Sequence, residues 1–198
     1  VCMDLKNIVS ELLLESNRTP VRALSAIAQA EKYLQQAYEG RYFFELIQNV
    51  RDANKEIEQD GIVLIELKDN TLTISNTGAE FSQKGIEGIT TIGESTKDSQ
   101  DFIGFKGIGF KSVQDITDNP KIITHYGSVF FDREQTLSGY DNGELTLNAT
   151  PLFFFPYFED TKLSKFEYET GVVTKIELPV KKKVLIEDIV EAFLKVQA

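Results

Sequence analysis

The chain has 198 residues, 41% of them hydrophobic and 26% charged, and a formal net charge of −10. This is the composition of an ordinary soluble globular protein with room for one substantial domain, and its acidity argues against direct binding of nucleic-acid backbones. No apolar run approaches the roughly 20 residues that cross a bilayer, and the lone Cys2 excludes an internal disulfide, so we expect a cytoplasmic protein without membrane contact.

The first part of the chain predicts helices. Apolar residues recur at helical spacing over 4–15, 23–38 and 42–59. The first two segments are separated by Asn17-Arg18-Thr19-Pro20 and the last two by Gly40, which are breaker signals. Because the chain begins at Val1 and ends inside an expected helix, we expect the N-terminal part of a longer protein.

After residue 61 the pattern changes to that of strands. A hairpin is predicted over 62–74 around Asp69-Asn70. The stretch 76–112 is rich in glycine and polar residues, with a short helix near 83–88, and such long loops usually bind something. Further strands are predicted at 122–124, 128–132, 144–147 and 172–178, before a helix at 184–196. Helices followed by a largely antiparallel sheet predict a two-layer α+β sandwich.

The third helix carries the first set of residues with chemical potential. Glu45, Asn49 and Asp52 lie at i, i+4 and i+7 and share one helical face. Taken alone, this stripe is more simply the solvated side of an amphipathic helix. The chemical alternative is that the Asn49 carbonyl helps to hold Mg²⁺, while a carboxylate one turn away activates a water molecule.

Two glycine-containing motifs follow. Residues 104–109 read G-x-x-G-x-G before a predicted helix start at Phe110, and successive amides there could cradle phosphates. The spacing matches neither the dinucleotide fingerprint nor a Walker loop. Asn76-Thr77-Gly78 follows a strand, where a side-chain carbonyl could accept from an adenine amino group. A simple Asn-x-Gly turn is the alternative and is favoured in isolation.

Taken in order, these motifs resemble those of the Bergerat-fold ATPases. Glu45–Ala53 resembles the E-x-x-x-N-x-x-D-A helix of the chaperone and MutL branch. Asn76–Gly78 sits where that family has its adenine motif, although Asn76 stands for an acid and Glu80 for a later glycine. Gly104–Gly109 resembles the phosphate-binding end of the ATP lid, and Thr170–Ile176 resembles the strand whose threonine, here Thr174, helps to hold adenine.

A narrower resemblance is to the sacsin-type and plant NOV-type domains. It is carried by Phe44–Asn49, Ile92–Lys97 and Gly104–Val113, and it covers about residues 22–180. The resemblance implies one ATP-binding domain over 1–198, with an N-terminal helix in 1–20 and a lid over 79–105. The implied fold is a two-layer α/β sandwich whose mixed, mainly antiparallel sheet is covered by helices on one face.

The resemblance also implies roles for individual residues. Glu45 would be catalytic and activate water, and Asn49 would hold Mg²⁺. Charge from Lys97 or Lys111 would add to the phosphate cradle. The implied ATP-binding residues are Asn49, Asp52, Ala53, Asn76, Gly78, Phe81, Ile92, Ser95, Thr96, Lys97, Gly104, Phe105, Lys106, Gly107, Ile108, Gly109, Phe110, Lys111 and Thr174.

The expected function is Mg²⁺-dependent ATP binding with slow hydrolysis, which drives lid closure in a larger chaperone-like or defence-related protein. Expected partners are ATP, an effector domain in the same longer chain and a second copy in a nucleotide-dependent homodimer. The alternatives are a nucleotide-sensing regulatory module without turnover and an interaction domain with a decayed pocket.

Three other features are interpreted as structural. His125 is expected to have no phospho-acceptor role. The apolar run 152–158 is predicted to be core or a sheet edge. The basic run Lys181–Lys183 is interpreted as a solvated helix entry.

Overall fold

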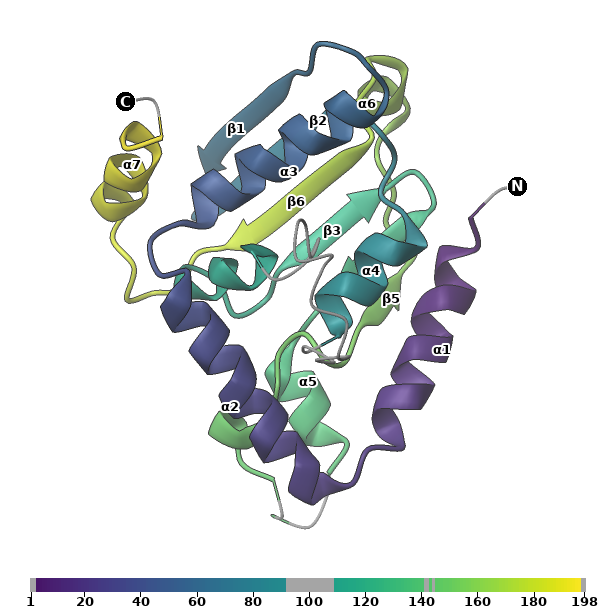
Figure 1. Cartoon of the computed structure of the whole chain (residues 1–198), viewed down its shortest axis with the longest axis vertical. Coiled ribbons are helices and arrows are strands. Elements are labelled where there is room, and N and C mark those ends of the chain that lie inside the picture. Colours follow the sequence, from purple (N-terminus) through teal and green to yellow (C-terminus); the bar gives the residue numbers. More distant parts are fainter. Residues whose placement is uncertain (1–2, 92–108, 141–142, 144, 197–198) are drawn as a thin grey trace, which may run out of the picture.

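The computed structural model describes residues 3–91, 109–140, 143 and 145–196. Its strands form a six-stranded sheet of order β1-β2-β6-β3-β4-β5, and its helices pack around this sheet (Figure 1). The helices are α1 Leu5–Asn17, α2 Val21–Ala37, α3 Tyr42–Glu56, α4 Gln83–Thr90, α5 Arg133–Ser138, α6 Lys165–Glu169 and α7 Ile186–Leu194, with 3₁₀ helices η1 Gly109–Asp115 and η2 Leu147–Ala149. The strands are β1 Val63–Lys68, β2 Thr71–Asn76, β3 Lys121–Thr124, β4 Gly127–Phe130, β5 Tyr157–Glu159 and β6 Thr174–Pro179.

Capping, proline and glycine residues explain where the first three helices begin. The Asp4 side chain accepts the Asn7 N–H at 3.0 Å, which caps α1. Pro20 precedes α2, where its fixed φ suits a helix start. Gly40 has φ of +72°, a conformation that separates α2 from α3 and favours glycine. The three predicted helices are therefore confirmed, with α3 ending at Glu56.

Every described strand pairing is antiparallel, so no parallel pair occurs in this part of the chain. Asp69 and Asn70 have φ of +49° and +58° at the β1–β2 turn, as a tight hairpin between twisted strands requires. β6 lies between β2 and β3, and this pairing brings the end of the chain into the middle of the sheet. The predicted α+β sandwich with a mainly antiparallel sheet is confirmed.

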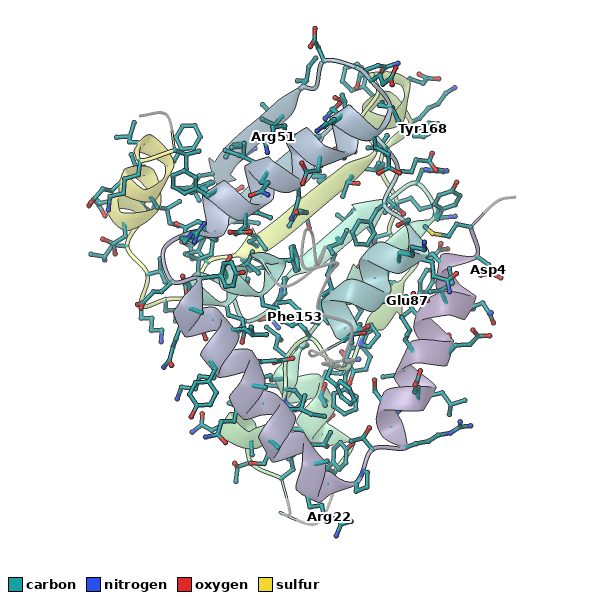
Figure 2. All side chains as sticks on the ribbon, in the orientation of Figure 1. Asp4, Arg22, Arg51, Glu87, Phe153 and Tyr168 are labelled. Atoms are coloured by element: carbon teal, nitrogen blue, oxygen red, sulfur yellow. The ribbon has the colours of Figure 1, made fainter. Side chains whose placement is uncertain are left out.

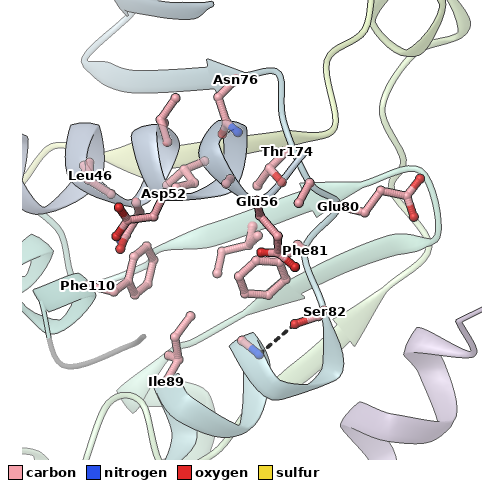
Figure 3. Close-up of a pocket in the computed structure, with 17 residues that line it drawn as sticks. Leu46, Asp52, Glu56, Asn76, Glu80, Phe81, Ser82, Ile89, Phe110 and Thr174 are labelled. Atoms are coloured by element: carbon pink, nitrogen blue, oxygen red, sulfur yellow. Dashed lines mark hydrogen bonds between the residues drawn. The ribbon is translucent and has the colours of Figure 1, made fainter. Parts of the chain in front are cut away.

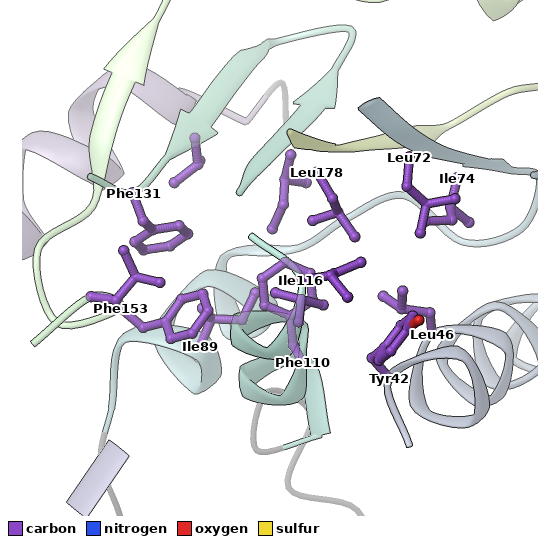
Figure 4. Packing of buried hydrophobic residues seen from close by; sticks show 14 of the residues in the cluster. Tyr42, Leu46, Leu72, Ile74, Ile89, Phe110, Ile116, Phe131, Phe153 and Leu178 are labelled. Atoms are coloured by element: carbon purple, nitrogen blue, oxygen red, sulfur yellow. The ribbon is translucent and has the colours of Figure 1, made fainter. Parts of the chain in front are cut away.

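The main core lies between the sheet and the helices on one of its faces. In Figure 1, α3 runs nearly along the strands and lies in front of β2, between β1 and β6, while α4 lies over the part of the sheet that holds β3 and β5. Leu72 and Ile74 of β2 face Tyr42 and Leu46 of α3 across this interface (Figure 4). α7 closes the outer side of α3, where the rings of Phe193 and Phe43 lie 5.5 Å apart.

The apolar run 152–158 lies partly in the core and partly at a sheet edge, the two predicted locations. Phe153 is fully buried near the centre of the molecule (Figure 2), with its ring 5.7 Å from that of Phe110 and 5.1 Å from that of Phe131. Farther along the run, β5 pairs with β4 at the sheet edge. The prediction of core or sheet edge is confirmed for this segment.

One predicted strand is wrong, and three short elements were not predicted. The segment expected to form a strand at 144–147 instead leads into η2, and residue 144 itself lies outside the described residues. No helix was predicted at α5 or α6, and β5 was predicted only as core or a sheet edge, because segments of three to six residues carry too little periodicity to be recognised. In the described residues, no helix is long and apolar enough to cross a membrane.

Candidate functional site

A pocket lies between α3, α4 and the covered face of the sheet (Figure 3). Side chains from α3 form one wall, those from α4 and η1 form another, and strand residues form its floor. The residues that line it are Leu46, Asn49, Val50, Asp52, Ala53, Glu56, Asn76, Ala79, Glu80, Phe81, Ser82, Gly85, Ile89, Phe110, Ile122, Thr174 and Ile176.

The α3 wall contains two residues of the predicted polar stripe, Asn49 and Asp52, and Glu56 one turn farther on. Asn49, Asp52 and Glu56 all face the pocket, because positions three and four residues apart share one side of a helix. On the core side of the same helix, Leu46 is buried and anchors α3 to the sheet. Asn49 and Glu56 remain exposed, so this side of the pocket is open to solvent.

The floor joins two polar residues that are distant in sequence. Asn76 at the end of β2 pairs directly with Thr174 at the start of β6, and each is 6% exposed. The backbone carbonyl of Asn76 accepts the Val173 N–H at 2.9 Å, which continues the pairing beyond the strand. The side-chain Nδ2 of Asn76 donates to the Thr77 carbonyl at 2.9 Å.

The turn after Asn76 packs directly against α3. The Ala79 N–H donates to the Ala53 carbonyl at 2.9 Å. Gly78 has φ of +127°, and a Cβ at this position would lie 3.0 Å from the Ala53 carbonyl carbon. Glycine is therefore required both by the backbone conformation and by the close approach of the helix.

Glu45 lies beside the pocket without lining it. Its Oε1 is 3.6 Å from an Arg41 guanidinium nitrogen, and its side chain is 15% exposed. A Cβ built on Gly109 would collide with the Glu45 carboxylate, so the two residues are in close contact. The structure thus brings the predicted catalytic carboxylate to the last glycine of the G-x-x-G-x-G motif.

Lys111 does not point to the pocket. Its Nζ donates to the Ile89 carbonyl at 2.7 Å and to the Thr91 carbonyl at 3.1 Å, and the side chain is fully buried. The expected phosphate contact from Lys111 therefore conflicts with this geometry, because its amine is already engaged behind the pocket wall. Phe110, its neighbour in η1, does line the pocket.

Carboxylates dominate the charge of the pocket. Asp52, Glu56 and Glu80 contribute carboxylates, and the described lining residues include no lysine, arginine or histidine. Glu80 at the rim accepts from the Tyr126 hydroxyl at 2.9 Å, and its other oxygen is 3.6 Å from the Nδ1 of His125. An anionic ligand would need its own charge offset by a cation.

The donor set of the pocket fits Mg²⁺ bound mainly through a ligand. Asn49 offers an amide oxygen and Asp52 a carboxylate, the hard donors this ion prefers. No group of three or more His, Cys, Asp or Glu side chains suited to a metal occurs in the described residues. An all-protein metal cage is therefore not what this part of the chain provides, whereas an ion shared with phosphates and water fits.

Some predicted site residues fall outside the described part of the chain, and some lining residues were not predicted. Ile92, Ser95, Thr96, Lys97, Gly104, Phe105, Lys106, Gly107 and Ile108 lie outside the described residues. Glu56 could have been found as the residue one turn after Asp52. Ile89, Ile122 and Ile176 carry no signal that distinguishes a pocket wall from core.

The other two features interpreted as structural have tertiary contacts. The His125 ring packs 3.6 Å from the Tyr126 ring and 4.7 Å from the Tyr168 ring, measured between centroids. Lys181 donates to the Gln114 carbonyl and is 3.2 Å from an Asp118 carboxylate oxygen. Lys181 is thus a contact of η1 rather than a fully solvated residue.

Two comparisons with known proteins bear on this site. The sequence model of the Sacsin domain family matches residues 26–149, which include α3, the Asn76 turn and η1. The Arabidopsis thaliana protein named Protein NO VEIN is 32% identical over 120 residues, or 60% of this chain. The alignment covers only 4% of the length of that relative.

Proposed function

The chain belongs to the Sacsin domain family, and on that premise we propose that it binds ATP with Mg²⁺ and hydrolyses it slowly. Nucleotide binding would occur in the pocket between α3, α4 and the sheet. In this proposal, closure of the predicted lid over residues 79–105 transmits the nucleotide state to a larger chaperone-like or defence-related protein.

The convergence of three separate motifs on one pocket carries the proposal. Asn49 and Asp52 come from α3, whereas Asn76 and Thr174 come from paired strands. At the pocket floor, polar groups buried among apolar residues are suited to reading the edge of a base. An adenine ring on this floor would lie against Ile122 and Ile176, with its phosphates directed toward Gly109.

Magnesium has a specific place in the proposal. Asn49 and, directly or through water, Asp52 would hold the ion, which would offset phosphate charge when bound. Because the described lining has only acidic charged groups, nucleotide binding in the absence of the ion would place phosphates among carboxylates.

Hydrolysis would depend on Glu45. As a general base, its carboxylate accepts a proton from water while the water oxygen bonds to the γ-phosphorus and the bond to the ADP oxygen breaks. The contact with Gly109 keeps the carboxylate beside the predicted phosphate cradle. An Arg41 guanidinium nitrogen lies 3.6 Å from Oε1 of Glu45, whereas Gly109 approaches Oε2.

A calorimetric titration with a non-hydrolysable ATP analogue tests the proposal. We expect binding that depends on Mg²⁺ and is weakened at least about tenfold by Asn49→Ala, the loss of one charge-assisted ligand. Lys55→Ala, an exposed change on the same helix, serves as the control. Absence of binding up to millimolar analogue would refute the proposed function.

The alternative is a sensing module that binds ATP without useful turnover. One observation favours it: Glu45 lies outside the pocket lining and is paired with Arg41. Binding of ATP with no release of phosphate would select this alternative. The effector and homodimer partners remain proposals as well, since the alignment spans only 4% of the longer relative.

A further inference from the structure

We infer that Asn54 is a positioning residue that fixes the amide of Asn76 and so sets the pocket's preference among nucleotide bases. Asn54 lies in α3, outside all of the predicted motifs and outside the pocket lining. The inference rests on the proposed nucleotide binding and adds to it the residue that controls which base is accepted.

The side-chain amide of Asn54 has a partner for every strong donor and acceptor. Its Nδ2 donates to the Val50 carbonyl at 2.8 Å and to the Thr77 carbonyl at 2.9 Å. Its Oδ1 accepts from the Thr77 hydroxyl at 3.2 Å. Because both amide protons are used, the oxygen and nitrogen cannot be exchanged without loss of these bonds.

Backbone encloses this amide on two sides. Asn54 is 5% exposed. A Cβ on Gly61 would collide with the Asn54 amide, and one on Gly78 would lie 3.0 Å from its Nδ2. Two glycines thus let the chain close over a polar group that is fully paired, and the amide has little freedom to reorient.

Thr77 connects the fixed Asn54 amide to Asn76. The Thr77 hydroxyl accepts the Ile62 N–H at 2.9 Å, and its carbonyl accepts from both Asn54 and Asn76. Rotating the Asn76 amide by half a turn would bring Oδ1 against the Thr77 carbonyl, so that two acceptors would face each other. The fixed carbonyl therefore holds Asn76 with its nitrogen toward Thr77.

This orientation determines what Asn76 offers to a ligand. Its Oδ1 remains available as an acceptor at the pocket floor, beside Thr174. Adenine carries an amino group at position 6, which can donate to that oxygen, whereas guanine carries a carbonyl oxygen there. The neutral Asn76 amide can thus prefer adenine as a carboxylate would, provided that the amide cannot rotate by half a turn.

The test compares adenosine and guanosine β,γ-imidotriphosphates, each with Mg²⁺, on the wild-type chain and on Asn54→Ala and Asn54→Asp. Both variants remove the donor to Thr77, and the first does so without adding charge. We expect the ratio of the guanosine Kd to the adenosine Kd to fall about tenfold, the worth of one buried hydrogen bond. Lys55→Ala should leave the ratio unchanged, and circular dichroism should verify that each variant is folded.

A second-site change separates positioning from general damage. A carboxylate at position 76 has only acceptors, so base preference should no longer depend on its orientation. In an Asn76→Asp background, Asn54→Ala is therefore expected to leave the Kd ratio within about twofold of its value in Asn76→Asp alone. A purely structural Asn54 would instead weaken both nucleotides equally in either background.

The outcomes distinguish this inference from the proposed function. If the wild-type chain binds neither nucleotide, the proposed function fails, and the base preference fails with it. If the wild-type chain prefers the adenosine analogue and the folded Asn54 variants keep the same ratio, the role of Asn54 is refuted while nucleotide binding stands.

Discussion

In the proposed function, hydrolysis of ATP depends on a single carboxylate, that of Glu45. Its position follows from helical spacing, since it lies one turn before Asn49 on α3. Its surroundings do not follow from spacing: Gly109 presses against it from η1, and Arg41 lies 3.6 Å from it on its own helix. An ion pair with a half-exposed arginine is weak, so Glu45 can exchange Arg41 for a water molecule at small cost.

Glu45→Gln should separate hydrolysis from binding. The amide keeps the size of the side chain but cannot accept a proton from water, so phosphate release should fall at least about 100-fold. The Kd for a non-hydrolysable ATP analogue should stay within about twofold. The measurement is steady-state phosphate release beside calorimetry, with the exposed Glu39→Gln as the control. Unchanged turnover in Glu45→Gln would rule out Glu45 as the base.

At the scale of elements, Lys111 fastens η1 to the end of α4. Its ammonium group donates to the carbonyls of Ile89 and Thr91 and lies 5.9 Å from the centre of the Phe153 ring. Because Ile89 and Phe110 both line the pocket, this contact holds together the two elements that form one of its walls. Burial lowers the pKa of Lys111 to about 8, although the charge of Glu31 acts in the opposite direction.

Stability should report this lowered pKa as a function of pH. Between about pH 8 and the ordinary lysine value of 10.5, the unfolded chain keeps a proton on Lys111 that the folded chain has lost. The unfolded state then binds more protons than the folded state, so the contribution of Lys111 to the free energy of unfolding rises with pH across that window. This stabilising contribution is lost as pH falls through 8. The slope for one proton is at most about 1.4 kcal/mol per pH unit.

Urea unfolding at several pH values checks the expectation, with Lys111→Met as the matched variant. The difference in free energy of unfolding between wild type and variant should grow in favour of the wild type as pH rises above 8. Groups that titrate in both proteins cancel in this difference. Parallel stability curves would show that Lys111 keeps an ordinary pKa.

At the scale of the whole molecule, a buried carboxylate joins parts of the chain that are far apart. Glu31 of α2 is fully buried and accepts the N–H groups of Leu152 and Phe153 at 2.6 and 2.8 Å. Arg133 of α5 lies 3.9 Å from the Glu31 carboxylate. Burial raises the pKa of Glu31, although its hydrogen-bond partners and Arg133 act to lower it. Through Arg133, which also donates to Gln114, the network continues to η1 behind the pocket.

Glu31→Gln should therefore destabilise the whole domain. The amide offers one acceptor in place of two, so one buried N–H loses its partner and Arg133 loses a counter-charge. We expect the free energy of unfolding to fall by about 3 kcal/mol. Chemical denaturation of this variant and of Glu15→Gln, an exposed change on α1, provides the comparison. A loss no larger than that of Glu15→Gln would show that Glu31 is not a structural centre.

The sequence by itself determined the elements whose signals are local. Apolar periodicity gave α1, α2 and α3, and the Asp69-Asn70 pair gave the hairpin between β1 and β2. The ordered motifs between residues 45 and 112 were enough to identify the family, which the match over residues 26–149 confirms. These features could be predicted because each helix, turn or single motif depends on residues close together in sequence, and the order of the motifs is itself written in the sequence.

Only the tertiary structure decided which residues meet. The pairing of Asn76 with Thr174 depends on the sheet order, and the bond from Leu152 to Glu31 joins residues 121 positions apart. Lys111 looked like a phosphate ligand by motif, yet its amine turns to carbonyls on α4. No motif singled out Asn54, yet it is buried and donates to the Thr77 carbonyl. A buried polar group takes whichever partner the fold brings to it, and no local pattern records that choice.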